Sequence, residues 1–118
     1  HSAASLQSML KNQFDAVTKN YKFDCFCNAE PFLTSDEELK STLQNAITKV
    51  VNVNPEQSTT GGTSDARFIT KLCPVIEFGL VGKTMHKIDE NVEVDDIMKL
   101  TSIYNKFLHN YFRVEKND

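Results

Sequence analysis

The chain has 118 residues, of which 40% are hydrophobic and 25% charged, the proportions of an ordinary globular protein. Its 13 basic and 16 acidic side chains give a net charge of -3, and its two arginines, Arg67 and Arg113, lie far apart in the sequence. A nucleic-acid partner would favour a basic stripe, which is missing. No apolar run approaches the roughly 18–20 residues that a membrane-spanning helix needs. We therefore expect neither nucleic acid nor a membrane as a partner.

The first predicted element is an amphipathic helix, capped by Ser2 or Ser5. Its apolar positions recur at spacings of three and four, at Leu6, Met9, Leu10, Phe14 and Val17. Residues 21–27 alternate apolar and polar side chains, a pattern typical of a half-buried strand. Glu30-Pro31 interrupts this strand, so a boundary is predicted within residues 28–34.

A second helix is predicted after this boundary, because Ser35 and Glu38, or Thr34 and Glu37, have the spacing of a capping box. Its apolar positions are Leu39, Leu43, Ala46, Ile47 and Val50, and residues 52–55 end it.

The rest of the chain is predicted as a glycine-rich loop (58–65), a short helix (67–72), a short strand (75–78), a loop (80–87) and a final helix (about 94–112). The apolar positions of the final helix are Ile97, Leu100, Tyr104, Phe107, Leu108 and Tyr111. This order predicts the α/β class, with an incomplete sheet flanked by helices.

The three cysteines, Cys25, Cys27 and Cys73, are an odd number, which argues against a closed set of disulfides. A zinc site would need further ligands at suitable spacings, and none follow them. We expect free, buried thiols in a reducing cytoplasm.

The run Thr60-Gly61-Gly62-Thr63-Ser64-Asp65 precedes the short predicted helix. Glycines allow a positive φ and a close approach of ligand to backbone, and hydroxyls cap helices whose positive end attracts anions. The run therefore indicates either a pocket for a carboxylate or a capped helix start after a tight turn. Asp65 is expected to cap the helix.

His86 lies in the loop after the second predicted strand, where a neutral imidazole can bind a metal and Asp89 or Glu90 could orient it. Taken alone, a single histidine is more often a surface or hydrogen-bonded core residue than a metal ligand.

Taken together, residues 60–69, 75–79 and 84–90 closely resemble the C-terminal motifs of succinyl-diaminopimelate desuccinylases, and the resemblance extends over about residues 14–112. It implies a cytoplasmic, homodimeric hydrolase that cleaves N-succinyl-L,L-2,6-diaminopimelate to succinate and L,L-2,6-diaminopimelate, for lysine and diaminopimelate biosynthesis. It also implies two zinc or cobalt ions, with His86 as a ligand and Gly62 and Thr63 in contact with substrate. Gly82 departs from many relatives, which have a substrate-binding asparagine there.

The resemblance implies that residues 1–30 are the end of a lid or dimerisation domain and residues 31–118 the C-terminal part of a zinc-peptidase-like catalytic domain. The chain has no His-x-Asp motif, and its one Glu-Glu pair, Glu37-Glu38, falls at the start of the second predicted helix, where these glutamates are assigned to the capping boxes. We therefore expect a fragment that contains no catalytic residue and is inactive alone. Two alternatives remain, another deacylase such as acetylornithine deacetylase and a non-catalytic association module.

Overall fold

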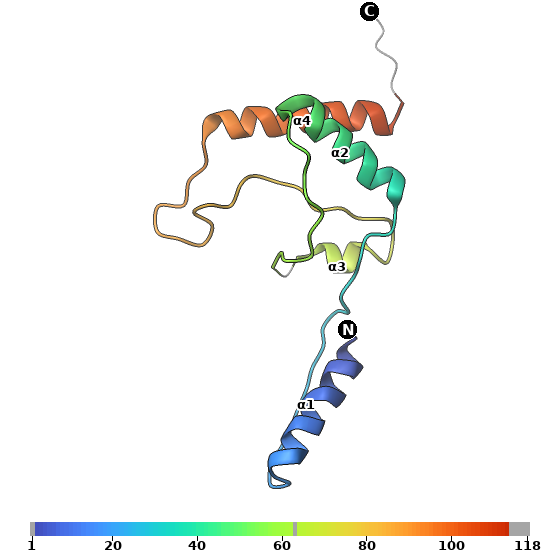
Figure 1. Ribbon diagram of the computed structural model, residues 1–118, viewed down its shortest axis with the longest axis vertical. Helices are drawn as coiled ribbons and strands as arrows, with labels where there is room; N and C mark the ends of the chain where they lie inside the picture. Colours follow the sequence, from blue (N-terminus) through green and yellow to red (C-terminus); the bar gives the residue numbers. More distant parts are fainter. Residues whose placement is uncertain (1, 63, 114–118) are drawn as a thin grey trace, which may run out of the picture.

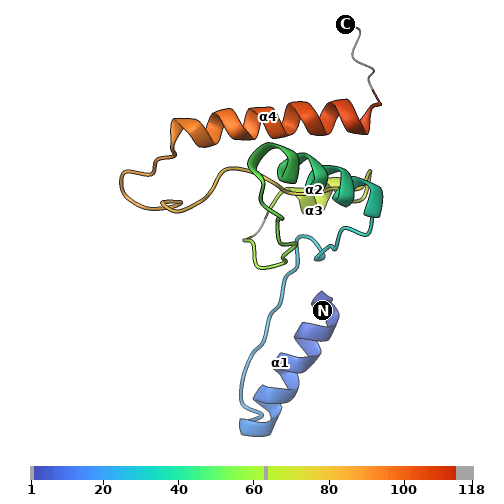
Figure 2. The same cartoon turned by 45° about the horizontal axis from the view of Figure 1, so that its top comes forward.

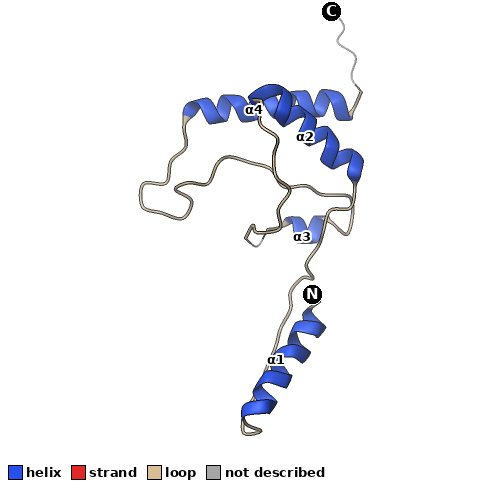
Figure 3. Ribbon diagram, in the orientation of Figure 1, coloured by secondary structure: helices blue, strands red, loops and turns tan. Residues whose placement is uncertain are grey.

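The computed structural model describes residues 2–62 and 64–113 of the chain, and its ordered elements are four helices. They are α1 (Ala3–Val17), α2 (Glu37–Val51), α3 (Ala66–Ile69) and α4 (Val94–Tyr111), joined by long loops (Figures 1 and 3). The molecule is elongated, with extents of 72 × 35 × 22 Å and a radius of gyration of 20.0 Å. A compact domain of this length would have a radius near ~13 Å. Much apolar surface therefore stays uncovered. None of the described helices has the length and apolarity to cross a membrane.

Helix α1 stands apart from the other three helices (Figure 2). Its start is a capping box, in which Ser5 N donates to Ser2 Oγ at 3.2 Å and Ser2 N donates to Ser5 Oγ at 3.0 Å. This confirms the predicted cap. No residue of α1 is buried, and Phe14 meets the rings of Tyr21 and Phe23 at 5.4 Å each. The segment after α1 therefore folds back along the helix.

Helix α2 begins and ends close to the predicted positions, but its cap differs. Asp36 is the N-cap, and its Oδ1 accepts a hydrogen bond from Leu39 N at 2.8 Å. This corrects the capping boxes expected from Thr34 or Ser35. A carboxylate here also suits the positive end of the helix dipole. Asn52 ends α2 in the left-handed conformation, with φ 54°.

The core lies between α2 and α4 and consists of Leu43, Ala46, Ile47 and Ile103. Around it pack Val50, Val51, Ile76, Phe78 and Phe107. The predicted apolar positions of α2 are confirmed, whereas Ile103, the one buried residue described in α4, was absent from the predicted set. Ile97 and Leu108 were in that set, yet they are 44% and 47% exposed.

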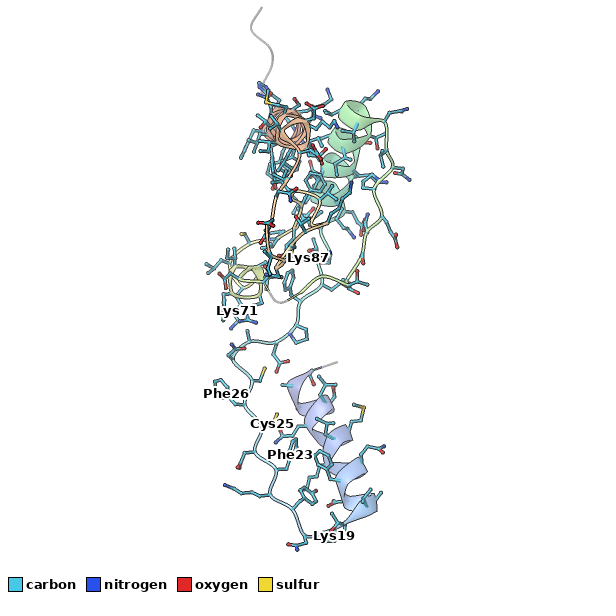
Figure 4. All side chains as sticks on the ribbon, turned by 90° about the vertical axis from the view of Figure 1, so that its left-hand side faces the viewer. Lys19, Phe23, Cys25, Phe26, Lys71 and Lys87 are labelled. Atoms are coloured by element: carbon cyan, nitrogen blue, oxygen red, sulfur yellow. The ribbon has the colours of Figure 1, made fainter. Side chains whose placement is uncertain are left out.

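The structure corrects the expected sheet, because residues 21–27 and 75–78 form no strand in the described part of the chain (Figure 3). A strand needs a neighbour that bonds its backbone groups, and neither segment has one. Side chains bond part of the second segment instead: the Thr34 hydroxyl donates to the Val75 carbonyl and the Tyr104 hydroxyl to the Phe78 carbonyl. In the first segment, Tyr21 and Phe23 are half-buried while Cys25 and Cys27 are exposed. Phe23 points toward α1 and Phe26 away from it (Figure 4).

Candidate functional site

Hydroxyl side chains make the local hydrogen bonds of the glycine-rich run that precedes α3. Ser58 Oγ lies 2.7 Å from Thr60 Oγ1 and accepts from Thr60 N, while Ser64 Oγ accepts from Ala66 N at 3.0 Å. Asp65 occupies the N-cap position without a side-chain hydrogen bond to the helix, so its expected capping role is not realised. Ser64 provides the contact that was expected of Asp65.

The glycines of this run do not adopt the positive φ that the sequence suggested, since no described glycine has one. Gly61 and Gly62 are exposed, and a Cβ on either would meet no atom within 4 Å. The described feature is therefore open space beside the backbone, which leaves room for a ligand. Thr63, the second predicted substrate contact, lies outside the described residues.

His86 lies on a loop of consecutive turns between residues 82 and 91. Met85 N donates to Gly82 O at 3.3 Å and Lys87 N to Thr84 O at 3.0 Å. His86 is exposed and has φ 61°, and its backbone N donates to Glu90 Oε2 at 3.3 Å. Glu90 thus holds the backbone of His86, which differs from the expected role of orienting the imidazole. Asp89 uses its carbonyl oxygen to accept from Asn91 Nδ2 at 2.7 Å.

A shallow, mostly apolar cavity of about 230 Å³ lies on the same loop, lined among others by Gly82, Met85 and Glu90. A Cβ on Gly82 would lie 2.6 Å from Met85 Cε. The thioether of Met85 therefore fills the place that a side chain at position 82 would take.

The described residues offer one candidate ligand for a metal ion, His86. His86 offers an exposed imidazole, which is a suitable zinc ligand. Within residues 2–62 and 64–113, no three histidine, cysteine, aspartate or glutamate side chains come close enough to hold an ion. The three cysteines are free and exposed, so the expectation of buried thiols was wrong while that of free thiols is confirmed. A complete metal centre requires donors from other chain segments or copies.

Residues 5–110 match the family model of peptidase family M20/M25/M40. The chain belongs to this family. Members of peptidase family M20/M25/M40 are metal-dependent, typically through zinc, and a zinc-peptidase-like fold suits the chain.

Its similar proteins include the succinyl-diaminopimelate desuccinylase of Pelagibacter ubique (strain HTCC1062), 47% identical over 95% of this chain and 30% of the relative. The enzyme of that name from Wolbachia pipientis wMel is 44% identical over 91% of this chain and 27% of the relative. The enzyme of that name from Beijerinckia indica is 55% identical over 73% of this chain and 22% of the relative. The chain thus spans less than a third of the length of these curated relatives.

Sequence reasoning missed Thr84 and Asn91, which hold the loop of His86 closed at its two ends. The only signal was indirect, namely a threonine and an asparagine flanking a histidine, and this pattern is common in turns.

Proposed function

We propose that this chain is the C-terminal part of a zinc-dependent amidohydrolase. The whole protein would hydrolyse N-succinyl-L,L-2,6-diaminopimelate to succinate and L,L-2,6-diaminopimelate in the cytoplasm, as a homodimer serving lysine and diaminopimelate biosynthesis. The observation that carries this proposal is 47% identity over 95% of the chain to a protein named succinyl-diaminopimelate desuccinylase. Membership of peptidase family M20/M25/M40 supports it.

Within this proposal, His86 is a metal ligand, and Gly62 and Thr63 contact substrate. The exposed imidazole on a hydrogen-bonded loop supports the first role, and the open space at Gly62 supports the second. Two zinc or cobalt ions, when bound, supply a nucleophilic hydroxide and polarise the amide carbonyl. This chain contributes one ligand, so the catalytic base and the remaining ligands come from the rest of the protein.

We further propose a division of the chain near residue 30, with residues 1–30 ending a lid domain and residues 31–118 belonging to the catalytic domain. Two contacts support this division. Glu30 Oε2 accepts from Ala3 N at 2.9 Å, which ties the end of the first unit to the start of α1. The rings of Phe14, Tyr21 and Phe23 pack together within the same unit.

The test is to produce the whole protein, with any coding region upstream of this chain, and to assay it with zinc. Release of succinate from N-succinyl-L,L-2,6-diaminopimelate is expected, with little acetate from N-acetylornithine. The chain alone should release neither. Preference for acetylornithine would favour the acetylornithine deacetylase alternative, and a protein without hydrolytic activity would favour an association module.

A further inference from the structure

The side chain of Thr84 closes the loop that carries His86. Its hydroxyl donates to the backbone carbonyl oxygen of Asn91 at 2.8 Å and accepts from the backbone N of Asn91 at 3.0 Å. One hydroxyl thus bonds both backbone groups of a residue seven positions later. His86 lies inside the segment that this double contact encloses.

Hydrogen bonds rather than apolar packing hold this segment in place. Between Gly79 and Asn91, every residue except Thr84 is exposed, and Ile88 is 94% exposed. A loop without a buried apolar anchor depends on its polar contacts.

The enclosed backbone is held in a conformation that needs such support. His86 and Asp89 have φ values of 61° and 60°, the left-handed region that residues other than glycine rarely occupy. Backbone of this kind persists where the surrounding contacts determine it, and it recurs at functional sites. Besides the turn hydrogen bonds, four contacts support this backbone: those of Thr84 with Asn91, of Glu90 with His86 N, of Asn91 Nδ2 with Asp89 O and of Lys87 Nζ with Lys83 O.

We propose that Thr84 is a positioning residue for His86. Its hydroxyl keeps residues 84–91 closed, and the closed loop fixes the left-handed backbone from which the imidazole projects. The positioning role of Thr84 rests on the proposed function of His86 as a metal ligand. Closure of the loop by Thr84 is independent of that function.

The first experiment measures loop closure in the whole protein, with three variants. Thr84→Val removes the hydroxyl and keeps the shape, Thr84→Ser keeps the hydroxyl, and Thr101→Val makes the same change on α4, where Thr101 Oγ1 donates to Ile97 O. Amide hydrogen exchange is followed in a peptide that covers residues 84–92. Exchange in Thr84→Val should be at least about tenfold faster than in the unaltered protein, since two hydrogen bonds are lost. Thr84→Ser and Thr101→Val should exchange there like the unaltered protein. Equal exchange in Thr84→Val would overturn the proposal.

The second experiment measures metal release from the zinc-loaded proteins into excess chelator. Zinc should leave Thr84→Val about tenfold faster or more, as for loss of a group that orients a metal ligand, and Thr84→Ser should restore slow release. Faster exchange with unchanged zinc release would show that the contact between Thr84 and Asn91 closes the loop without positioning His86, which overturns the proposal. A His86→Ala protein with full zinc content would contradict the metal role itself, a failure distinct from unchanged exchange in Thr84→Val.

Discussion

His86 combines three properties that a structural histidine would not need together: exposure, a left-handed backbone and a carboxylate bonded to its own N–H. If His86 binds metal as proposed, the whole protein with His86→Ala should lose one of the two proposed zinc ions and lower turnover more than about a hundredfold, beyond the loss expected for an outer partner of a ligand. Folding should be retained because the side chain is exposed. Metal analysis, kcat and circular dichroism check this. His109→Ala, at an exposed position on α4, is the matched control.

Gly62 allows a sharp test of substrate proximity. A Cβ there meets nothing within 4 Å and no positive φ forbids it, so Gly62→Ala should change the free energy of unfolding by less than about 0.5 kcal/mol. If substrate approaches this backbone in the whole protein, the added methyl group should raise KM or lower kcat, whereas Gly61→Ala should do neither. A Gly62→Ala protein with unaltered kinetics would place substrate elsewhere.

The hydrogen bond from the Tyr21 hydroxyl to Asp15 Oδ1, at 2.8 Å, makes the contact between α1 and the following segment depend on pH. It lowers the pKa of Asp15 below its ordinary 3.8 and raises the pKa of Tyr21 above its ordinary 10.0. The stabilisation from Asp15 is therefore present above pH 3.8 and lost as the pH falls through its lowered pKa. The stabilisation from Tyr21 is present below pH 10.0 and lost as the pH rises through its raised pKa.

Titration of the Tyr21 ring by NMR in the chain checks this prediction. Asp15→Asn should return the pKa of Tyr21 toward its ordinary value, because it removes the carboxylate charge. Asp24→Asn, which alters the carboxylate paired with Lys22, should leave Tyr21 unchanged. An equal effect of both variants would show that general charge is responsible.

At the scale of elements, α2 and α4 are the pair of helices that packs closely in the described structure, and Ile103 is 4% exposed at their contact. In the chain alone, Ile103→Ala should lower the free energy of unfolding by about 2–4 kcal/mol. Leu108→Ala removes a side chain of similar size that is 47% exposed, so it should cost less than about 1 kcal/mol. Urea unfolding measures both. Equal losses would mean that the other face of α4 is covered in solution.

The helices could be predicted because their signals are local. Ser2 and Ser5 cap α1, and the apolar positions of α2 recur every three or four residues, so no distant partner is needed. The expected strands at residues 21–27 and 75–78 do not form in the described chain, since a strand depends on a partner segment far away in the sequence, which local patterns do not reveal. Ile103 was missed because α4 is apolar around more than one face, and only the position of α2 decides which face is buried.

The candidate site was predicted in part for the same reason. His86 and Gly62 were singled out from residue type, and their roles come from the resemblance and stay predictions; both residues lie exposed on loops. The hydrogen bonds between Thr84 and Asn91 were missed, because these two residues come together only when the loop is closed. Sequence spacing alone does not tell which hydroxyl meets which backbone group.

At the scale of the molecule, the uncovered apolar surface predicts that the chain alone self-associates. Leu6, Met9 and Phe14 on α1 are 39% exposed or more, as are Ile97, Tyr104 and Leu108 on α4. Faces of this kind favour association with another copy. Sedimentation equilibrium over a wide concentration range should show species above 13.4 kDa, the mass of one chain. A single 13.4 kDa species at the highest concentration would mean that the chain covers these faces itself.

The contact between α2 and α4 also couples the motions of the two candidate site segments, which contain Gly62 and His86. Residues 52–93 form the long excursion between α2 and α4, which pack against each other, and this excursion contains both Gly62 and His86. Closing such a loop is an entropic step that depends weakly on its length, so the excursion should tolerate insertions better than the helices do. A fluctuation that lifts α4 from α2 would displace both segments together, and the loss of the α2–α4 contact would be a single event in the hydrogen exchange of these two helices. The position of the His86 loop relative to α2 thus depends on the aliphatic side chains between α2 and α4, whereas closure of the loop itself depends on Thr84 and Asn91.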